Sequence, residues 1–269
     1  MFIFRLLGLL SDQNQLYFQI PNRFLSIFFI ILSFGLLSPT LLKANEPQWS
    51  SYESLLKHHL TQNTKDGITL SWLDYKSIKA DPDYKKTVDE LQNYNVDQLD
   101  NKKAKLAFYI NAYNILAIKM VVDNWPVKSI KDIGSWFNPV WKKNVGKISG
   151  KTVTLHEIEH DILRKMGEPR IHMAIVCASL SCPDLRHEPY RTNMLEAQLE
   201  DQTQQFFNNK SKGLEISGDS IKTSKILDWF AEDFNDQMAF IRKYRNDIPS
   251  NSKIDGFLNY NWSLNGNTN

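Results

Sequence analysis

Residues 105–122, KLAFYINAYNILAIKMVV, constrain the fold of this chain more than any other segment. They form the most apolar stretch after the N-terminal region, and their apolar side chains recur at helical spacing. The segment is too short and too rich in Asn, Tyr and Lys to cross a bilayer. We therefore expect a helix at the centre of the hydrophobic core, with the rest of the chain packed around it.

The N-terminal region has the order of features that marks a secretory signal. Residues 24–42, FLSIFFIILSFGLLSPTLL, are almost wholly apolar; Arg23 precedes them and Lys43-Ala44 follows. A basic, an apolar and a small-residue region in this order predict a signal peptide over residues 1–44, and so an exported protein, periplasmic or secreted. The apolar run is also nearly long enough to span a bilayer. An uncleaved N-terminal anchor is the alternative, and membrane contact is expected only in that case.

Residues 45–269 are expected to form a single globular α+β domain. They contain no internal repeat, low-complexity tract or long Gly/Ser linker, and their number suits one domain with its own core. The leader holds three basic residues and one acidic residue of the chain's 32 and 30, which leaves the remainder with a net charge of zero. A balanced charge has none of the basic character of a nucleic-acid-binding protein, so no nucleic-acid partner is expected.

The hydrophobic pattern of this domain changes between helical and strand-like spacing. Helices are expected over residues 51–64, 83–93, 105–122, 154–166, 194–209 and 226–235, and hairpins over 145–155 and 214–224. Thr154 and Glu157 form a capping box at the start of one helix, and Gly167 stands where a left-handed stop belongs. Helices outnumber strands, so the sequence predicts an α+β fold, rich in helix around a small, mainly antiparallel sheet.

Residues 156–160, HEIEH, match the H-E-x-x-H pattern of zinc metallopeptidases. His156 and His160 have the one-turn spacing that a zinc site needs, but the compact third ligand is missing from the six residues that follow. More distant ligands such as His172 or His187 are not marked by any second motif. We expect no metal and no cofactor, and a zinc hydrolase through His156 and His160 stays as an alternative.

The helix that contains this pattern presents a different residue to the core. At about 100° per residue, its apolar face consists of Leu155, Ile158, Ile162 and Met166. Glu159 falls within that face, whereas His160 lies at its rim. A carboxylate directed into a core costs several kcal/mol unless it is paired or hydrogen-bonded. Glu159 is therefore either a functional group or a member of a buried ion pair, with Arg164 or Arg170 as the cation.

The chain's two cysteines, Cys177 and Cys182, lie close together at the end of an apolar segment. In an exported protein such a pair usually oxidises to a structural disulfide, although so short a loop gains little stability from it. Segment 170–177, RIHMAIVC, is expected to be a strand that ends at a sheet edge. On a regular strand His172 and Cys177 face opposite sides, which favours a bonded core histidine over direct contact.

Three motifs together resemble the bacterial branch of the domain-of-unknown-function 547 (DUF547) family. They are AFYINAYNILAI at 107–118, LHEIEHDILRKMGEPRIHMAIVCASLSCPDL at 155–185 and SKILDWFAEDF at 224–234. The middle motif is long and specific, and the resemblance extends over essentially the whole mature chain. It implies a papain-like or transglutaminase-like fold with a site built from Glu159, His160 and Cys177. Other branches of the family carry Ser or Asp in place of Cys182, which favours Cys177 as the nucleophile.

The residues and the resemblance together predict an exported thiol hydrolase or acyl transferase. Cys177 would attack a carbonyl carbon, His160 would carry the proton, and Glu159 would orient or tune the site. Open backbone N–H groups in the small residues after Cys177 would stabilise an oxyanion. The expected partner is a small or peptide substrate of the cell envelope, with a peptide or isopeptide bond as the first candidate. The main alternative is a non-catalytic binding module with a Cys177–Cys182 disulfide.

Four further residues are secondary candidates for the site. His172 is a rival base, with Glu159 as the group that would orient it, and Cys182 is the second thiol. Asn111 and Asn114 share a core-facing side of the central helix, where buried amides need hydrogen-bond partners. These two amides would either shape the loop that carries Cys177 or bond to ordinary backbone groups nearby.

Overall fold

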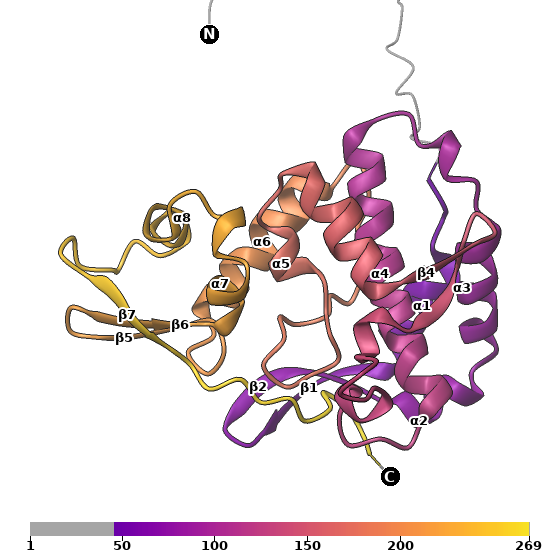
Figure 1. Ribbon diagram of the computed structural model, residues 1–269, viewed down its shortest axis with the longest axis horizontal. Coiled ribbons are helices and arrows are strands. Elements are labelled where there is room, and N and C mark those ends of the chain that lie inside the picture. Colours follow the sequence, from indigo (N-terminus) through magenta and orange to yellow (C-terminus); the bar gives the residue numbers. More distant parts are fainter. Residues whose placement is uncertain (1–45, 269) are drawn as a thin grey trace, which may run out of the picture. The chain divides into compact units, whose positions relative to one another are not determined.

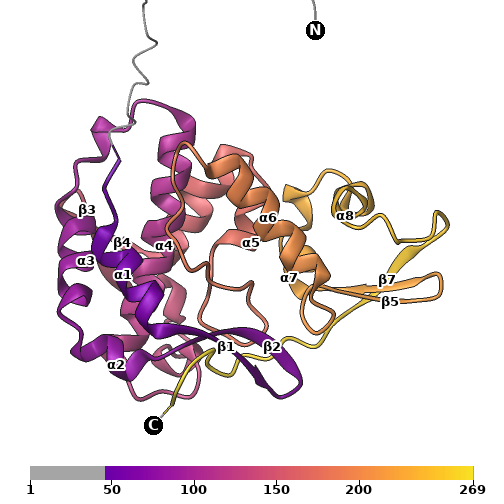
Figure 2. The same ribbon diagram turned by 180° about the vertical axis from the view of Figure 1, so that it is seen from behind.

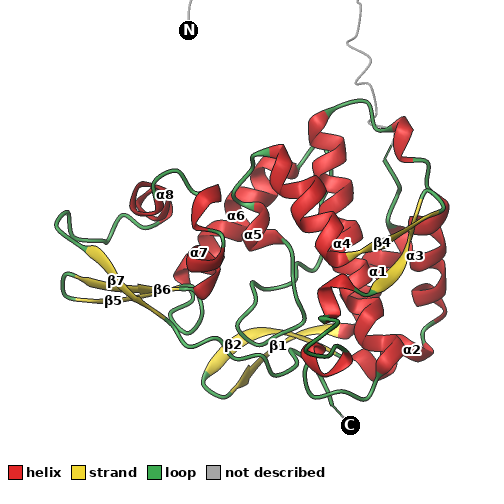
Figure 3. Ribbon diagram, in the orientation of Figure 1, coloured by secondary structure: helices red, strands yellow, loops and turns green. Residues whose placement is uncertain are grey.

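The computed structural model describes residues 46–268, all of which lie within one compact unit of the chain. The signal peptide or anchor predicted for residues 1–44 lies outside the described residues. Helices and short strands are mixed along the chain, with helices in the majority (Figures 1 and 3). The predicted α+β class is therefore confirmed. The likeness to papain-type enzymes stays a prediction.

The described part of the chain contains α-helices, short helical turns and strands in the following order. The α-helices are α1 (Ser50–His59), α2 (Tyr75–Ala80), α3 (Pro82–Asn93), α4 (Lys102–Asn124), α5 (Ile171–Ala174), α6 (Leu195–Asn208), α7 (Lys225–Trp229) and α8 (Gln237–Tyr244). The helical turns are η1 (Val96–Gln98), η2 (Ile130–Ile133), η3 (Val140–Lys142), η4 (Glu157–Leu163), η5 (Arg164–Met166) and η6 (Ala231–Asp233). The strands are β1 (Leu60–Lys65), β2 (Ile68–Leu73), β3 (Asn144–Ile148), β4 (Lys151–Thr154), β5 (Leu214–Ser217), β6 (Ser220–Thr223) and β7 (Lys253–Phe257).

The central helix α4 confirms the prediction made from its apolar run, and it is longer than predicted. It has 23 residues, and the side chain of Asn101 caps its start by accepting the Ala104 N–H at 2.9 Å. By length and composition α4 could cross a bilayer, yet 83% of its most apolar window is buried inside the protein. Its apolar surface is therefore used for packing within the fold.

The strands form three small sheets. β1–β2 and β3–β4 are two-stranded antiparallel hairpins, and β5–β6–β7 is a three-stranded sheet in which β7 pairs parallel with β6. The predicted hairpins over 145–155 and 214–224 correspond to β3–β4 and β5–β6 and are confirmed. Because the strands are so few and short, helix packing supplies most of the core.

Two apolar clusters meet at α5 and α6. The larger one surrounds α4, and the smaller one lies between the β5–β6–β7 sheet, α7 and α8. Leu195 and Leu199 at the start of α6 belong to the larger cluster, whereas Phe206 and Phe207 at its end belong to the smaller one. Figures 1 and 2 accordingly place α5 and α6 between α4 and this sheet.

Three predicted elements differ from the structure. The helix expected over residues 226–235 is divided at Phe230 into α7 and the helical turn η6. The helix expected over residues 51–64 ends at His59, because the chain turns back at Asp66-Gly67, both with positive φ, and β1 pairs with β2. The strand expected over 170–177 is wrong: residues 171–174 form the short helix α5, and an extended segment follows. Pro169 stands at the start of this turn, where its carbonyl accepts the His172 N–H at 3.2 Å. Because these residues do not form a strand, the prediction that His172 and Cys177 face opposite sides of one no longer applies.

The helix that carries the H-E-x-x-H pattern begins as predicted and then widens. Thr154 and Glu157 form the capping box, with side chain-to-backbone distances of 3.0 and 2.7 Å. Gly167 ends the segment at φ 63°, also as predicted. Between them, η4 is a π-helical segment, in which successive side chains are closer together in angle than 100°. For this reason Leu163, expected at the edge of the apolar face, is fully buried.

The C-terminal segment returns from the three-stranded sheet to the first hairpin, as the yellow trace in Figure 1 shows. On the way it bonds to the loop that follows Cys177: the Leu180 N–H donates to the Ser263 carbonyl at 2.9 Å and the Asn265 N–H to the Ala178 carbonyl at 3.2 Å. The Leu73 N–H in β2 donates to the Asn265 carbonyl at 3.0 Å. This segment therefore fixes the cysteine loop from the outside.

Candidate functional site

A cavity of about 360 Å³ lies where η4, α5, the cysteine loop, α7 and the C-terminal segment meet. Every residue of the predicted Cys-His-Glu site lines it. Its lining residues are Tyr113, Trp141, His156, Glu159, His160, His172, Ile175, Cys177, Cys182, Pro183, Ile226, Trp229, Phe230, Tyr260 and Trp262. A mostly aromatic pocket with a few convergent polar groups is the usual form of a small-molecule site.

The two buried asparagines of α4 fasten the backbone on both sides of the cysteine loop. Asn114 accepts the Val176 N–H at 2.8 Å and donates to the Ala174 carbonyl at 3.0 Å. Asn111 forms the same pair of bonds with the N–H and the carbonyl of Tyr190, at 2.9 and 2.7 Å. Asn114 therefore shapes the segment that leads into Cys177, one of the two roles predicted for it, while Asn111 fixes the chain that leads into α6.

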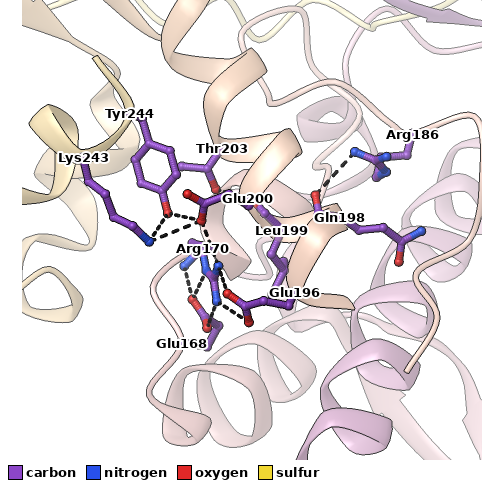
Figure 4. A network of polar contacts seen from close by, with 10 residues as sticks. All are labelled: Glu168, Arg170, Arg186, Glu196, Gln198, Leu199, Glu200, Thr203, Lys243 and Tyr244. Atoms are coloured by element: carbon purple, nitrogen blue, oxygen red, sulfur yellow. Dashed lines mark hydrogen bonds and ion pairs between the residues drawn. The ribbon is translucent and has the colours of Figure 1, made fainter. Parts of the chain in front are cut away.

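An ion-pair network around Arg170 holds α5 against α6 (Figure 4). The Arg170 guanidinium, at the start of α5, donates to three carboxylates, those of Glu168, Glu196 and Glu200, at 2.6 to 3.2 Å. Glu159 is not among them, so the predicted Glu159–Arg170 ion pair is wrong. The network instead fixes the position of α5, and with it that of His172.

His172 is a neutral, buried imidazole whose Nε2 bonds to Asp233 at 2.7 Å. Burial lowers the pKa of His172 to about 4, although the Asp233 carboxylate acts in the opposite direction. Burial raises the pKa of Asp233, but hydrogen bonds from Arg164 and His172 outweigh it and lower that pKa overall. An ionised carboxylate only accepts, so His172 donates from Nε2–H. Its Nδ1 is then a buried acceptor with no hydrogen-bond partner among the described residues.

Glu159 faces the cavity, and within the described range its carboxylate has a single hydrogen bond, which it accepts from the Tyr113 hydroxyl at 3.3 Å. Burial raises its pKa to about 7, against the lowering effects of Tyr113 and of Arg164. The cation that was expected as its partner is engaged elsewhere, because Arg164 pairs with Asp233 and Glu232. Glu159 also does not orient His172, whose hydrogen bond goes to Asp233. A carboxyl group with this pKa exchanges its proton at neutral pH.

His160 lies at the cavity wall and packs against His156 in a tilted arrangement, with ring centroids 4.3 Å apart. Arg164 can only donate, so the His160 Nδ1 accepts from the Arg164 Nη1 at 2.9 Å and the ring proton sits on Nε2. Burial lowers the pKa of His160, and His156 and Arg164 lower it further. Among the described residues His160 makes no hydrogen bond to Cys177, so its role as base stays a prediction.

Cys177 and Cys182 are joined by a disulfide. Cys177 is half-buried, whereas Cys182 is buried. The Tyr260 hydroxyl lies 3.2 Å from both sulfur atoms, and the Ser179 hydroxyl lies 3.3 Å from both. The Cys177 N–H also donates to Cys182 Sγ at 2.9 Å. In this form neither cysteine is a thiol, and the more accessible sulfur is that of Cys177.

Several of the backbone N–H groups after Cys177, which were expected to be open, donate to carbonyl groups. Those of Leu180, Ser181 and Cys182 donate to the carbonyls of Ser263, Asn261 and Ser179, at 2.9 to 3.3 Å. The C-terminal segment supplies two of these acceptors, which the sequence does not reveal. The predicted oxyanion site therefore stays a prediction, and these three N–H groups are already bonded. The Tyr260 hydroxyl, 3.2 Å from both sulfur atoms, is a further donor beside them.

The zinc alternative has no ligand set to build on in residues 46–268. Within this range no three His, Cys, Asp or Glu side chains are grouped so that they could hold a metal ion. His156 and His160 lie on adjacent turns as the pattern requires, but their rings pack against each other.

The sequence did not reveal several residues that complete the cavity. Tyr113 lies within the predicted core helix, and nothing in its local pattern marks it as a site residue, although a buried tyrosine hydroxyl normally needs a polar partner. Trp229, Tyr260 and Trp262 form an aromatic wall, with ring centroids 4.6 to 5.6 Å apart. Tyr260 and Trp262 come from a segment without periodicity, so no local pattern indicates where they pack.

Residues 96–207 match the model of a family described as "Protein of unknown function, DUF547". The match covers α4, the H-E-x-x-H segment and both cysteines, and it stops before Asp233 and the aromatic wall. No curated protein and no solved structure matches the chain significantly.

Proposed function

Because residues 96–207 of this chain belong to the DUF547 family, whose function is unknown, we propose a function from the geometry of the cavity. The cavity is the active site of a thiol-dependent hydrolase or acyl transferase. Cys177 is the nucleophile, and the Cys177–Cys182 disulfide is the form in which it is held inactive. The first substrates to consider are peptide or isopeptide bonds of the cell envelope.

One observation carries this proposal: the more accessible sulfur of the pair lines the same cavity as a carboxyl group whose pKa is close to neutral. Cys177 and Glu159 come from separate elements, the cysteine loop and η4, and both face this space. The pKa of Glu159 is raised to about 7 by burial. A perturbed acid beside a potential nucleophile in a cleft is typical of functional sites.

The reaction requires a reductant first. A dithiol passes two electrons and two protons to the disulfide and becomes a disulfide itself, which leaves Cys177 and Cys182 as thiols. The Cys177 thiolate then attacks a carbonyl carbon, the bond to the leaving group breaks, and the leaving group takes up the proton that the thiol released. Attack by water or an amine on the thioester transfers the acyl group and restores the thiol.

Glu159 is the best-placed proton acceptor in this scheme. The Tyr260 hydroxyl, 3.2 Å from Cys177 Sγ, would relay the proton. Burial raises the pKa of Tyr260, and the nearby charge of Glu159 raises it further. His160, the proton carrier that the sequence predicts, is the second acceptor in this scheme. Its Nδ1 is occupied by Arg164, so it would act only after that contact is broken.

The disulfide supports a second function, a non-catalytic binding module. In that case Cys177 and Cys182 stay oxidised and stabilise the cavity wall, and the aromatic rings of Trp229 and Trp262 bind a small ligand. This module requires no reductant and has no reactive thiol.

Alkylation of two matched variants separates the two functions. Cys182→Ser leaves Cys177 as a free thiol, and Cys177→Ser leaves Cys182 as a free thiol in the same loop. Iodoacetamide labelling of the purified chain, mapped by mass spectrometry across pH 5 to 9, measures the pKa of each thiol. We expect Cys177 to label rapidly below pH 7, because an ordinary thiol has a pKa of about 8.5. Addition of Glu159→Gln should slow this labelling.

The oxidised wild-type chain should label at neither cysteine, and treatment with a dithiol should expose Cys177. If Cys177 in Cys182→Ser labels with an ordinary pKa of about 8.5, no faster than Cys182 in the companion variant, the thiol enzyme is excluded. The binding module then becomes the leading function.

A further inference from the structure

We infer that the loop Gly134–Pro139 is an anchor that inserts Trp136 and Phe137 into an anionic lipid surface. These two neighbouring side chains are 92% and 95% exposed. The next most exposed large apolar side chains of the described part, Trp229 and Met194, are only 45% and 42% exposed. Isolated apolar residues on a surface are ordinary, but two adjacent aromatic rings almost wholly in water indicate a binding surface.

The loop holds the two rings outward through its own backbone. The Ser135 N–H donates to the Asn138 carbonyl at 3.0 Å, and the Asn138 N–H donates to the Ser135 hydroxyl at 3.1 Å. Trp136 and Phe137 are thus the two central residues of a closed turn. Gly134 fits tightly at its base, since a Cβ there would lie 2.5 Å from the Val140 nitrogen. The tip is therefore ordered in a conformation that does not bury its aromatic side chains.

The surroundings of the tip are positively charged. Between residues 128 and 143 the chain has four lysines, Lys128, Lys131, Lys142 and Lys143, and a single acidic residue, Asp132. The Asp132 carboxylate is engaged in a capping box with Ser129. The whole chain has a net charge of only +2, so this cluster is a local excess. Lysines around an exposed apolar tip complement the negative surface of an anionic bilayer.

The chemistry of the tip fits a membrane interface better than a protein groove. Trp has an apolar ring with a polar N–H, and it concentrates at the headgroup level of bilayers. Phe provides apolar area to the acyl region below, while lysine chains extend to the phosphates above. One short turn is too small to form a stable protein interface by itself, whereas it suffices as a shallow insertion.

The anchor lies next to the proposed active site. η3 follows the loop directly, and its Trp141 lines the cavity and packs on Trp262 with ring centroids 6.0 Å apart. Lys131 precedes the loop in the sequence, and its ammonium lies 4.9 Å from the centroid of the same Trp262 ring. A membrane bound at the tip would therefore hold the cavity close to the lipid surface. The inference itself does not depend on the chemistry of the cavity.

Vesicle binding of full-length variants tests this inference. All variants keep residues 1–44, so any binding by that apolar region is common to them. The probe is a vesicle of three parts phosphatidylcholine to one part phosphatidylglycerol, with pure phosphatidylcholine for comparison. We expect the double variant Trp136→Ser/Phe137→Ser to bind the anionic vesicles about tenfold more weakly than wild type. Met194→Ser, which removes a partly exposed apolar side chain elsewhere, should bind like wild type.

Two measurements make the test specific to the tip. Lipids brominated in the acyl chains should quench wild-type tryptophan fluorescence more than that of Trp136→Phe, and only in anionic vesicles. Lys142→Gln/Lys143→Gln should weaken binding, with a reduced dependence on salt. Circular dichroism checks that each variant is folded, which we expect because neither ring is buried.

Equal binding and equal quenching in wild type and the tip variants would overturn the inference. Self-association of wild type in the absence of lipid, lost in Trp136→Ser/Phe137→Ser, would also overturn it. The tip would then be an interface between two copies of the chain.

Discussion

Arg170 at the start of α5 and His172 within it belong to two different groups of buried ionisable side chains. The two groups use their hydrogen-bonding capacity to very different degrees. Arg170 meets three carboxylates, and these hydrogen bonds raise its pKa despite its burial. On the cavity side, the buried Nδ1 of His172 has no partner in the described part of the chain, where Glu159 has one long bond, to Tyr113. The first group can only be a support for the fold. The second keeps unused hydrogen-bonding and proton-exchange capacity.

This difference supports the proposed site without reference to any relative. Evolution usually pairs a buried charge because an unpaired one costs stability. Where the chain leaves a carboxyl group neutral and an imidazole half-bonded beside a cavity, the stability cost is typical of binding or catalysis. The same chain satisfies Arg170 fully within a short distance along the sequence. The incomplete bonding at the cavity is therefore a local property of the site.

The largest effect on stability should come from removing the Asn114 amide, which links α5 to the segment before Cys177. Asn114→Ala deletes the amide that bonds both the Ala174 carbonyl at the end of α5 and the Val176 N–H before Cys177. Two buried backbone groups are then left without partners, at about 2 kcal/mol each. We expect the free energy of unfolding, measured with urea, to fall by about 4 kcal/mol.

Asn124→Ala in the same helix is the matched control. Within residues 46–268 its exposed side chain bonds only to Met120 of its own helix, through the carbonyl and the sulfur, so the change should be a few tenths of a kcal/mol. Equal losses in the two variants would mean that Asn114 does not couple the supporting network to the site.

The second prediction concerns the pH dependence of stability that the raised pKa of Glu159 causes. The folded-state pKa of Glu159, about 7, is above its ordinary value of 4.5, so between these values the folded protein binds more protons than the unfolded chain. Its contribution to stability is thus complete below pH 4.5 and is lost as pH rises through 7. Relative to wild type, Glu159→Gln should gain up to about 3 kcal/mol between pH 4.5 and 8.

Urea unfolding of both proteins at a series of pH values measures this gain. The comparison must be a difference between variants, because His172 acts with the opposite sign. Its folded pKa of about 4 is below its ordinary value of 6.5, so its contribution is lost as pH falls through that range. A stability difference between Glu159→Gln and wild type that does not change with pH would contradict the raised pKa of Glu159.

The supporting structure was more predictable from the sequence than the site was. The core helix α4, the capping box of Thr154 and Glu157, and the two hairpins at Ser149-Gly150 and Gly218-Asp219 depend on neighbours within a few residues. Local spacing and turn chemistry are therefore enough to predict them. Glu159 was singled out because a carboxyl group stood within an apolar helical face.

The partners of the candidate residues could not be predicted, because they come from distant parts of the chain. Asp233 reaches His172 across 61 positions, and Tyr260 reaches Cys177 across 83. Segment 170–177 was predicted as a strand because a short apolar run has no period that separates strand from helix. Arg170, through its contacts with α6, is the long-range element that fixes the helical turn.

The third prediction concerns the ion-pair network around Arg170. Arg170→Met should lower the free energy of unfolding by about 2 kcal/mol, less than the 3–5 kcal/mol typical of a broken buried pair. The reason is that Glu196 and Glu200 are 66% and 46% exposed and return to water, so only Glu168 stays partly buried. Thiol labelling of Cys177 in the Cys182→Ser background should keep its pH midpoint.

Glu200→Gln is the control for this variant. It removes one half-exposed member of the network and should cost less than about 0.5 kcal/mol. If Arg170→Met instead shifted the pH midpoint of labelling, the network would influence the site electrostatically as well as mechanically, and the two groups would not be separate.

The smallest expected effect distinguishes the two causes that act on Glu159. Burial raises the pKa of Glu159 and is the larger cause, whereas the hydrogen bond from Tyr113 lowers it. Tyr113→Phe removes only the hydroxyl, so the pKa of Glu159 should rise further, by less than about one unit. The measurement is the pH midpoint of the stability difference between Tyr113→Phe and Tyr113→Phe/Glu159→Gln. A midpoint that falls would mean that the Tyr113 hydroxyl, rather than burial, keeps Glu159 protonated near neutral pH.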